Sequence, residues 1–221
     1  GNYMNFTEPL QFNLKSSYSS NPQLKKIIQD FRENIEDGAV SGDDYNNFLK
    51  TYSPYLNIEK PSFLSNLRFF FEYQIGYMYW RYLMWNFTGR QDDNQGEYTI
   101  INGNWISGIP IIDELRLGNQ SKLHPDALNN KARNTYFFLP FLLGLIGLYF
   151  IYQTDPKRFW VLLLFFLFTG LALKVYLNER PFEPRERDYA LVGSFYVFAL
   201  WIGLGSWALI QKLQTFISKK I

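Results

Sequence analysis

The feature that most constrains the fold is a set of three long apolar segments between residues 135 and 210. The first, at 135–152, carries no charge and would extend about 27 Å as a helix, close to the thickness of a membrane's hydrocarbon core. The second, at 159–177, carries only Lys174, near an end where a long side chain can reach the interface. The third, at 189–210, is uncharged. One such segment fits a buried helix of a soluble protein, but three in succession predict an all-α membrane protein, a bundle of transmembrane helices.

Composition supports the membrane interpretation and excludes several chemistries. Aromatic residues make up 19% of the chain, and the rings of Tyr and Trp suit the boundary between membrane and water. The absence of cysteine excludes disulfides, thiolate metal sites and cysteine nucleophiles. The net charge of +2 gives no indication of nucleic-acid binding, so we expect no nucleic-acid partner.

A fourth segment, at 63–89, is rich in aromatic residues but interrupted by Arg68, Glu72 and Arg81. The charges make it a poor transmembrane span. Its mixture of aromatic and charged side chains is typical of a helix that lies in the membrane interface, or is partly inserted beside other spans. Two interpretations stay open: the helix only braces the bundle, or it also lines a groove for lipid or substrate.

The remaining segments are polar. Residues 1–62 are expected to form a small, mostly helical extramembrane region, because apolar residues recur at helical spacing after Asn21. Ser41 followed by Asp44 is the pattern of a capping box and predicts a second helix there. Residues 90–134 contain many Gly, Asn and Asp residues and are expected to form a long extramembrane loop.

The distribution of Lys and Arg among the loops is nearly even, so charge alone orients the chain weakly. The loop at 178–188 also contains acids, and its arginines are candidates for function rather than for orientation. We therefore expect the loop at 153–158 and the tail at 211–221 to lie in the cytoplasm. The large polar region and the 178–188 loop would then face the periplasm from a bacterial inner membrane. Since the sequence begins with Gly1 rather than Met, we also expect it to be part of a longer protein.

The loop at 178–188 reads NERPFEPRERD and combines charges of alternating sign with two prolines. Prolines restrict the backbone, and planar guanidinium groups bind phosphate oxygens in pairs. A phosphate at the membrane surface is therefore the predicted ligand of Arg180, Arg185 and Arg187. Acidic neighbours would orient these arginines, or bind a metal or a sugar hydroxyl: Glu179, Glu183, Glu186 and Asp188. The alternative is a solvated charged turn that separates two spans.

Other charged residues are candidates for the polar rim of a cavity: Arg81, Arg90, Asp92 and Asp93, together with Glu183, Glu186 and Asp188. The alternative for the residues at 90–93 is an ordinary turn that ends the aromatic helix. The sequence contains no Ser-His-Asp set, no phosphate-binding glycine loop and no metal-ligand spacing. The single histidine, His124, is expected to be a surface residue.

Three stretches together resemble a known family: YQIGYMYWRYLMWNFTGRQDD at 73–93, NGNWISGIPIIDELRLGN at 102–119 with NKARNTYFFLPFLLGLIGL at 130–148, and YLNERPFEPRERDYALVGSFYVFALWIGLG at 176–205. The resemblance covers roughly residues 63–210. It is to a bacterial membrane family grouped as glycosyltransferase family 117, which is related to protein O-mannosyltransferases. It implies a GT-C architecture of many transmembrane helices with an active site that faces the outer compartment.

The resemblance implies that the chain is the C-terminal part of an enzyme that moves a mannose-like sugar from a polyprenyl-phosphate donor to a protein hydroxyl. Arg180, Arg185 and Arg187 would hold the donor phosphate. The implied partners are membrane lipid, the lipid-linked sugar and an acceptor protein. GT-C enzymes place the catalytic carboxylate in their first outer loop, so the base is expected upstream of Gly1 and this part alone is expected to be inactive. No metal site is predicted, and a requirement for a divalent metal is left open.

Two further hypotheses keep the membrane fold without the transfer reaction. In the first, the chain is a scaffold or transport subunit and the 178–188 loop docks a partner. In the second, it helps to flip a lipid carrier, which would need the arginines but would attach no sugar to protein.

Overall fold

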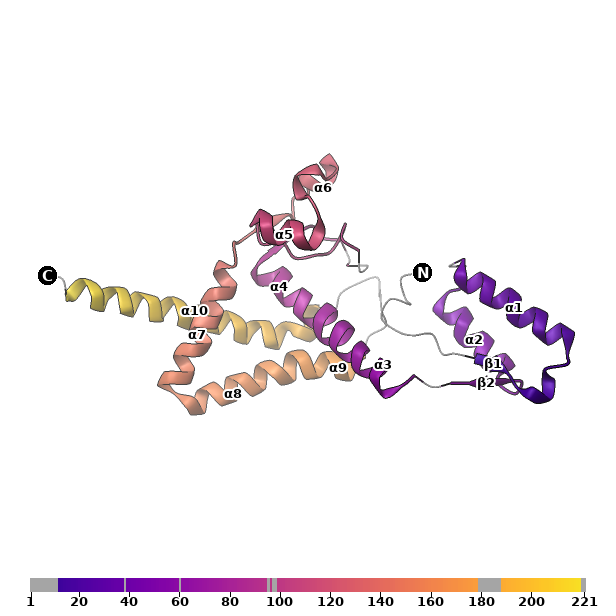
Figure 1. The fold of residues 1–221 in the computed structure, drawn as a ribbon. Helices are drawn as coiled ribbons and strands as arrows, with labels where there is room; N and C mark the ends of the chain where they lie inside the picture. The colour runs from indigo at the N-terminus through magenta and orange to yellow at the C-terminus, as the bar shows by residue number, and fades with distance from the viewer. Residues whose placement is uncertain are drawn as a thin grey trace. The chain divides into compact units, whose positions relative to one another are not determined.

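The computed structural model describes residues 12–37, 39–59, 61–94, 96, 99–178 and 188–219. The chain forms two compact units, Gly1–Phe71 and Glu72–Ile221. Most of the described residues are helical, with two short β-ladders, so the mostly helical fold predicted from the sequence is confirmed (Figure 1). The candidate phosphate-binding residues at 179–187 lie outside the described residues.

The first unit is a pair of helices joined to a two-stranded ladder. Strand β1 (Phe12–Leu14) pairs antiparallel with β2 (Leu56–Ile58), and the 3-10 turn η2 (Ser16–Tyr18), α1 (Pro22–Glu36) and α2 (Gly42–Tyr52) lie between them in the chain. The core consists of Phe12, Ile28, Leu49 and Leu56. The helices follow the predicted pattern. The ladder was not predicted because strands of three residues are too short to show alternation.

Both helices begin at caps that the sequence contains. The side chain of Asn21 accepts hydrogen bonds from the backbone N–H groups of Gln23 and Leu24, at 3.0 and 3.3 Å. At the start of α2, Ser41 and Asp44 exchange side-chain-to-backbone hydrogen bonds, which confirms the predicted capping box. The hydrogen bonds from Ser41 lower the pKa of the Asp44 carboxyl.

The aromatic segment forms one helical run with a long π-helical stretch: α3 (Phe63–Arg68), η3 (Phe69–Arg81) and α4 (Tyr82–Phe87). In the second unit this run buries Tyr73, Tyr77, Tyr79 and Tyr82. The run ends before Gly89, whose φ of 147° and whose closeness to the carbonyl oxygen of Ile106 both require glycine.

Residues 89–135 form a small folded region, here called the cap, whose regular structure the loop prediction did not anticipate. It contains β3 (Gly89–Arg90), α5 (Pro110–Leu117), η4 (Gln120–Lys122), α6 (Pro125–Leu128) and β4 (Asn134–Thr135). Strands β3 and β4 pair antiparallel and close the cap at its base. Inside it, the buried Asp113 carboxylate accepts the backbone N–H groups of Ser107 and Gly108 at 2.8 and 2.7 Å. Asp113 follows these two partners by six and five residues, inside a segment that was predicted to be a loop, so the prediction did not include these contacts.

The apolar segments form α7 (Leu139–Thr154), a run of α8 (Pro156–Leu167), η5 (Phe168–Ala172) and α9 (Leu173–Leu177), and α10 (Asp188–Ser218). Within the described residues, two helical runs are long and apolar enough to cross a membrane, Pro156–Leu177 and Tyr189–Ser218. The first predicted span, at 135–152, is shorter as a helix than predicted because Thr135 pairs in β4, and Tyr136 and Phe137 donate their N–H groups to the carbonyl oxygens of Thr88 and Ser107. The third continues through residue 210 into the predicted tail, since no Gly or Pro interrupts it there.

Two glycines set the close packing of α7 against α10. A Cβ atom on Gly147 would lie 1.7 Å from the carbonyl oxygen of Trp201, and one on Gly205 would lie 2.0 Å from that of Leu143. Only glycine therefore allows the two backbones to approach this closely. The core beside them includes Leu191, Val197, Phe198 and Trp201.

Lys174 is a correction to the sequence prediction. Only 3% of its surface is exposed, so the side chain is enclosed by protein instead of extending to an interface.

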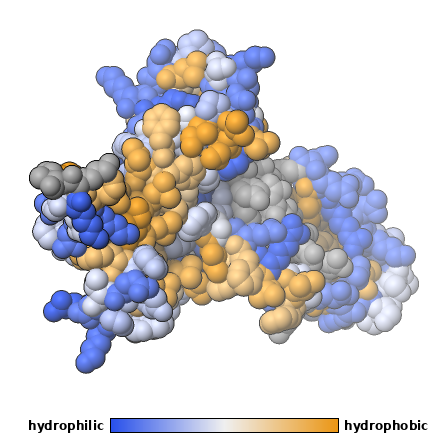
Figure 2. Space-filling view, turned by 60° about the vertical axis from the view of Figure 1, so that its left-hand side comes forward, coloured by the Kyte–Doolittle hydropathy of each residue, from blue (hydrophilic) through white to orange (hydrophobic). Residues whose placement is uncertain are grey.

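The apolar helices place their apolar side chains both inward and outward. Figure 2 shows hydrophobic side chains gathered over the outward faces of the apolar helices.

Candidate functional site

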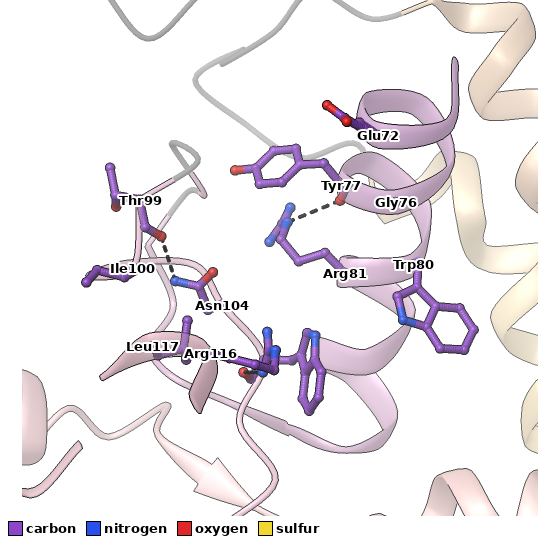
Figure 3. Close-up of a pocket in the computed structure, with 11 residues that line it drawn as sticks. Glu72, Gly76, Tyr77, Trp80, Arg81, Thr99, Ile100, Asn104, Arg116 and Leu117 are labelled. Atoms are coloured by element: carbon purple, nitrogen blue, oxygen red, sulfur yellow. Dashed lines mark hydrogen bonds between the residues drawn. The ribbon is translucent and has the colours of Figure 1, made fainter. Parts of the chain in front are cut away.

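A cavity of about 530 Å³ lies between the π-helical stretch and the cap, within the second unit (Figure 3). Eleven residues line it, and their side chains combine aromatic rings, two arginines, a carboxylate and an amide. They are Glu72, Gly76, Tyr77, Trp80, Arg81, Thr99, Ile100, Asn104, Trp105, Arg116 and Leu117. A cavity of this size and composition suits a small molecule with both apolar and anionic parts.

The helical wall of the cavity carries Arg81, which is buried and held at several points. Its guanidinium lies over the ring of Tyr77, 4.5 Å from the centroid, and its Nε donates to the backbone oxygen of Tyr77 at 3.2 Å. Its Nη1 donates to the carbonyl oxygen of Gly103 in the cap. Gly96 packs against the same guanidinium, where a Cβ atom would lie 3.1 Å from the guanidinium carbon. Arg81 is thus a cation fixed in place.

The cap wall carries the second cation, Arg116, at the exposed side of α5. Its guanidinium stacks on the indole of Trp105 at 3.4 Å, and its Nη1 donates to the backbone oxygen of Trp105 at 3.1 Å. Partial burial lowers the pKa of Arg116, and the negative charge of Asp113 opposes that decrease. An arginine remains protonated at neutral pH, so Arg116 is a planar cation open to the cavity.

Hydrogen bonds behind the cavity hold the segment 99–105 in shape. The amide nitrogen of Asn104 donates to the side-chain oxygen of Gln91 and to the carbonyl oxygen of Thr99, both at 2.8 Å. The Oδ1 atom of Asp92 accepts the backbone N–H of Gly103 at 2.9 Å. Burial raises the pKa of the Asp92 carboxyl, and its hydrogen bonds from the backbone oppose that rise.

The structure separates the four described residues that were predicted to form a rim. Arg81 lines the cavity, whereas Asp92 lies behind the wall and supports it through Gly103. Arg90 lies over the indole of Trp85 at 3.9 Å and takes part in the β3–β4 pairing, so it serves the base of the cap. Asp93 is exposed and accepts a hydrogen bond from Asn130 at 2.9 Å, which lowers the pKa of its carboxyl.

The other predicted site residues lie outside the described residues: Arg180, Arg185, Arg187, Glu179, Glu183 and Glu186. Asp188 begins α10, but its side chain is also outside the description. The structure therefore neither joins these residues to the cavity nor separates them from it.

No protein-family model, curated protein or solved structure matches this chain.

The two arginines and the aromatic rings suit an organic anion. Among the described residues, no three His, Cys, Asp or Glu side chains gather as a metal site. His124 is exposed, as predicted, and caps α6 beside Asp126. Two guanidinium groups can bind phosphate oxygens, and the exposed faces of aromatic rings can pack on a sugar.

Sequence reasoning missed Trp105, Asn104 and Arg116 because it treated residues 90–134 as a loop. One signal was available: Pro110 opens a segment, PIIDELRL, with Pro at the first helical turn and Gly118 just after its end. That pattern predicts a helix, although the stacking of Arg116 on Trp105 depends on how the cap folds.

Proposed function

We propose that this chain is part of a membrane-embedded glycosyltransferase that takes a sugar from a polyprenyl-phosphate donor and transfers it to a hydroxyl group of an acceptor protein. The membrane part of the proposal is supported by the outward faces of the apolar helices. In the most apolar window of Pro156–Leu177, only 11% of the residues are buried. A core helix of a soluble protein would be mostly buried, and an exposed apolar surface of this extent is unfavourable in water. We propose the bacterial inner membrane, with the cap facing the periplasm.

The observation that carries the catalytic part is the pair of arginines, from two different elements, in one cavity. Arg116 is exposed and presents its guanidinium to a ligand, while Arg81 is buried and keeps a fixed positive charge nearby. When the bond between sugar and phosphate breaks, negative charge grows on the lipid phosphate. Preorganised cations stabilise that charge more than they stabilise the bound donor.

The aromatic lining supports the sugar part of the proposal. Tyr77, Trp80 and Trp105 line the cavity together with the Asn104 amide. The apolar faces of a sugar ring pack on aromatic rings, and a sugar hydroxyl can donate to the side-chain oxygen of Asn104. The phosphate roles of Arg180, Arg185 and Arg187 remain part of the same proposal.

The direct test is the binding of a short-chain polyprenyl monophosphate to the detergent-solubilised chain with Arg116→Gln. Because a hydrogen bond to a charged group contributes about 1.5–3 kcal/mol, the affinity should fall about tenfold or more. Arg158→Gln is the matched control. Arg158 is an exposed arginine that does not line the cavity, and it forms an ion pair with Asp155, between α7 and α8. Equal affinity of the wild-type, Arg116→Gln and Arg158→Gln chains would show that the cavity does not bind the donor phosphate.

A second test separates transfer from the scaffold and flippase alternatives. In the full-length protein, Arg116→Gln and Arg185→Ala should abolish sugar transfer to protein while expression and membrane insertion persist. Transfer at the wild-type rate in both variants would show that neither arginine holds the donor phosphate, whereas a scaffold would show no transfer even in the wild-type protein. Binding of the lipid phosphate without any covalent sugar on protein would favour a carrier that moves lipid.

A further inference from the structure

The outward face of α5 carries two large aliphatic side chains that are mostly exposed. Ile111 is 73% exposed and Leu115 is 84% exposed. They lie one turn apart, and they are on the side of the helix opposite Asp113 and Leu117, which are buried in the cap. Aliphatic side chains in such a pair on a surface helix indicate a partner.

The beginning of α5 is tied to the beginning of α7. The N–H of Phe137 donates to the carbonyl oxygen of Ser107 at 3.0 Å, and a Cβ atom on Gly108 would lie 2.9 Å from a ring carbon of Phe137. Gly108 stands two residues before α5, and Phe137 stands two residues before α7. Figure 1 shows α5 beside this end of α7. Phe137 and Leu139 are themselves exposed, so large apolar side chains are exposed at α5 and at the start of α7.

The length of α7 locates this junction in a membrane. Its 16 residues extend about 24 Å, whereas the hydrocarbon core is about 30 Å thick. The end near Asp155 meets the charged residues Lys157 and Arg158, which belong in water. The shortfall of about 6 Å therefore falls at the other end, where Phe137 and α5 lie. Amphipathic helices bury their apolar face about 5–10 Å into that layer.

We propose that α5 is a membrane-surface helix whose Ile111 and Leu115 side chains enter the bilayer interface beside the start of α7. The proposal rests on the membrane part of the proposed function. It adds that the wall of the cavity that carries Arg116 lies at the lipid surface, so that the headgroup of a lipid-linked substrate reaches the cavity without leaving the membrane.

The absence of cysteine from the sequence makes single-cysteine labelling a direct test. Leu115→Cys and Ile111→Cys would each be labelled with an environment-sensitive fluorophore, and the chain reconstituted in phosphatidylcholine vesicles. Leu145→Cys in α7 is the reference for the membrane interior, and Ser121→Cys in η4 is the control for water. Lipids with a spin label near the headgroup or deep in the acyl chain serve as quenchers.

The expected result is a loss of fluorescence at residues 111 and 115 with the headgroup quencher, at 145 with the deep quencher, and at 121 with neither. If 145 is quenched while 111 and 115 behave like 121, the chain spans the membrane and the α5 proposal is wrong. Blue-shifted but unquenched emission at 111 and 115 would indicate a protein partner and also overturn it. If 145 is unquenched as well, the membrane part of the proposed function fails too.

Discussion

At the scale of single residues, the backbone of Gly103 joins the helical wall of the cavity to the residues behind the cap. The carbonyl oxygen of Gly103 accepts from Arg81, while its N–H donates to Asp92. The cation in the helical wall and the carboxylate behind the cap are thus linked through the backbone of the segment between them. The linkage connects a buried arginine and a buried aspartate that form no direct ion pair with each other.

Asp92→Asn should change how stability depends on pH. Since burial raises the pKa of Asp92, the folded chain binds the proton more tightly than the unfolded chain, and this contribution to stability is lost as pH rises through the raised pKa. Asparagine keeps the acceptor for Gly103 and has no charge to bury. We expect the free energy of unfolding of the variant, relative to wild type, to increase from pH 3.8 upward.

The measurement is thermal or denaturant unfolding at a series of pH values from 3.8 upward. Asp93→Asn is the control, because the pKa of exposed Asp93 is lowered and its effect should have the opposite sign. A difference between wild type and Asp92→Asn that does not vary with pH would contradict the prediction.

At the scale of elements, glycines and caps decide where helices meet and begin. The α7–α10 contact depends on Gly147 and Gly205, and α2 depends on a capping box at its first turn. The π-helical stretch is fixed to its neighbours by polar contacts. The hydroxyl groups of Tyr79 and Ser194 lie 2.6 Å apart, and Gly170 leaves room for both.

Gly147→Ala should separate α7 from α10, because the added methyl group meets the backbone of Trp201, which cannot rotate away. Overpacking of this kind costs about 1–3 kcal/mol or more. Gly203→Ala in α10 adds the same methyl group where nothing lies within 4 Å. Thermal unfolding in detergent should therefore show a lower midpoint for Gly147→Ala than for Gly203→Ala. Equal midpoints would mean that the close contact is absent.

Ser41→Ala should fray the first turn of α2, because the alanine cannot accept the N–H of Asp44. The expected cost is about 1 kcal/mol. Hydrogen exchange at the amides of α2 measures it, with Ser20→Ala in the exposed turn before α1 as the control. The lowered pKa of Asp44 means that its share of the cap is present above pH 3.8 and is lost as pH falls through the lowered value. Unchanged exchange would show that the cap contributes little.

At the scale of the whole molecule, the character of the apolar surfaces separates a membrane protein from a soluble one. Phe168 is 67% exposed near the middle of the Pro156–Leu177 run. In water, a charge at an exposed position costs little. In the centre of a bilayer it costs about 2.5–3.5 kcal/mol, so the same substitution has different consequences in the two settings.

Phe168→Arg should therefore reduce the fraction of chain that stays in membranes after an alkaline wash. Gln214→Arg, at an exposed position in the polar end of α10, should leave that fraction unchanged. If Phe168→Arg instead increases the yield of soluble, folded chain, the membrane part of the proposed function is wrong.

The sequence by itself determined the features that depend on neighbours a few residues apart. Periodicity placed α1, the Ser41–Asp44 spacing identified the cap and start of α2, and continuous apolar composition marked the segments that became α7 to α10. These features are local because a helix satisfies its own backbone hydrogen bonds within each turn.

Only the tertiary structure decided the cap and the cavity. The pairing of β3 with β4 joins residues such as Arg90 and Asn134, and it draws the start of the first apolar segment away from α7. Arg81 and Arg116 line one cavity because the cap folds back on the aromatic helix. Such contacts depend on chain closure over many residues, and no window of sequence contains both partners.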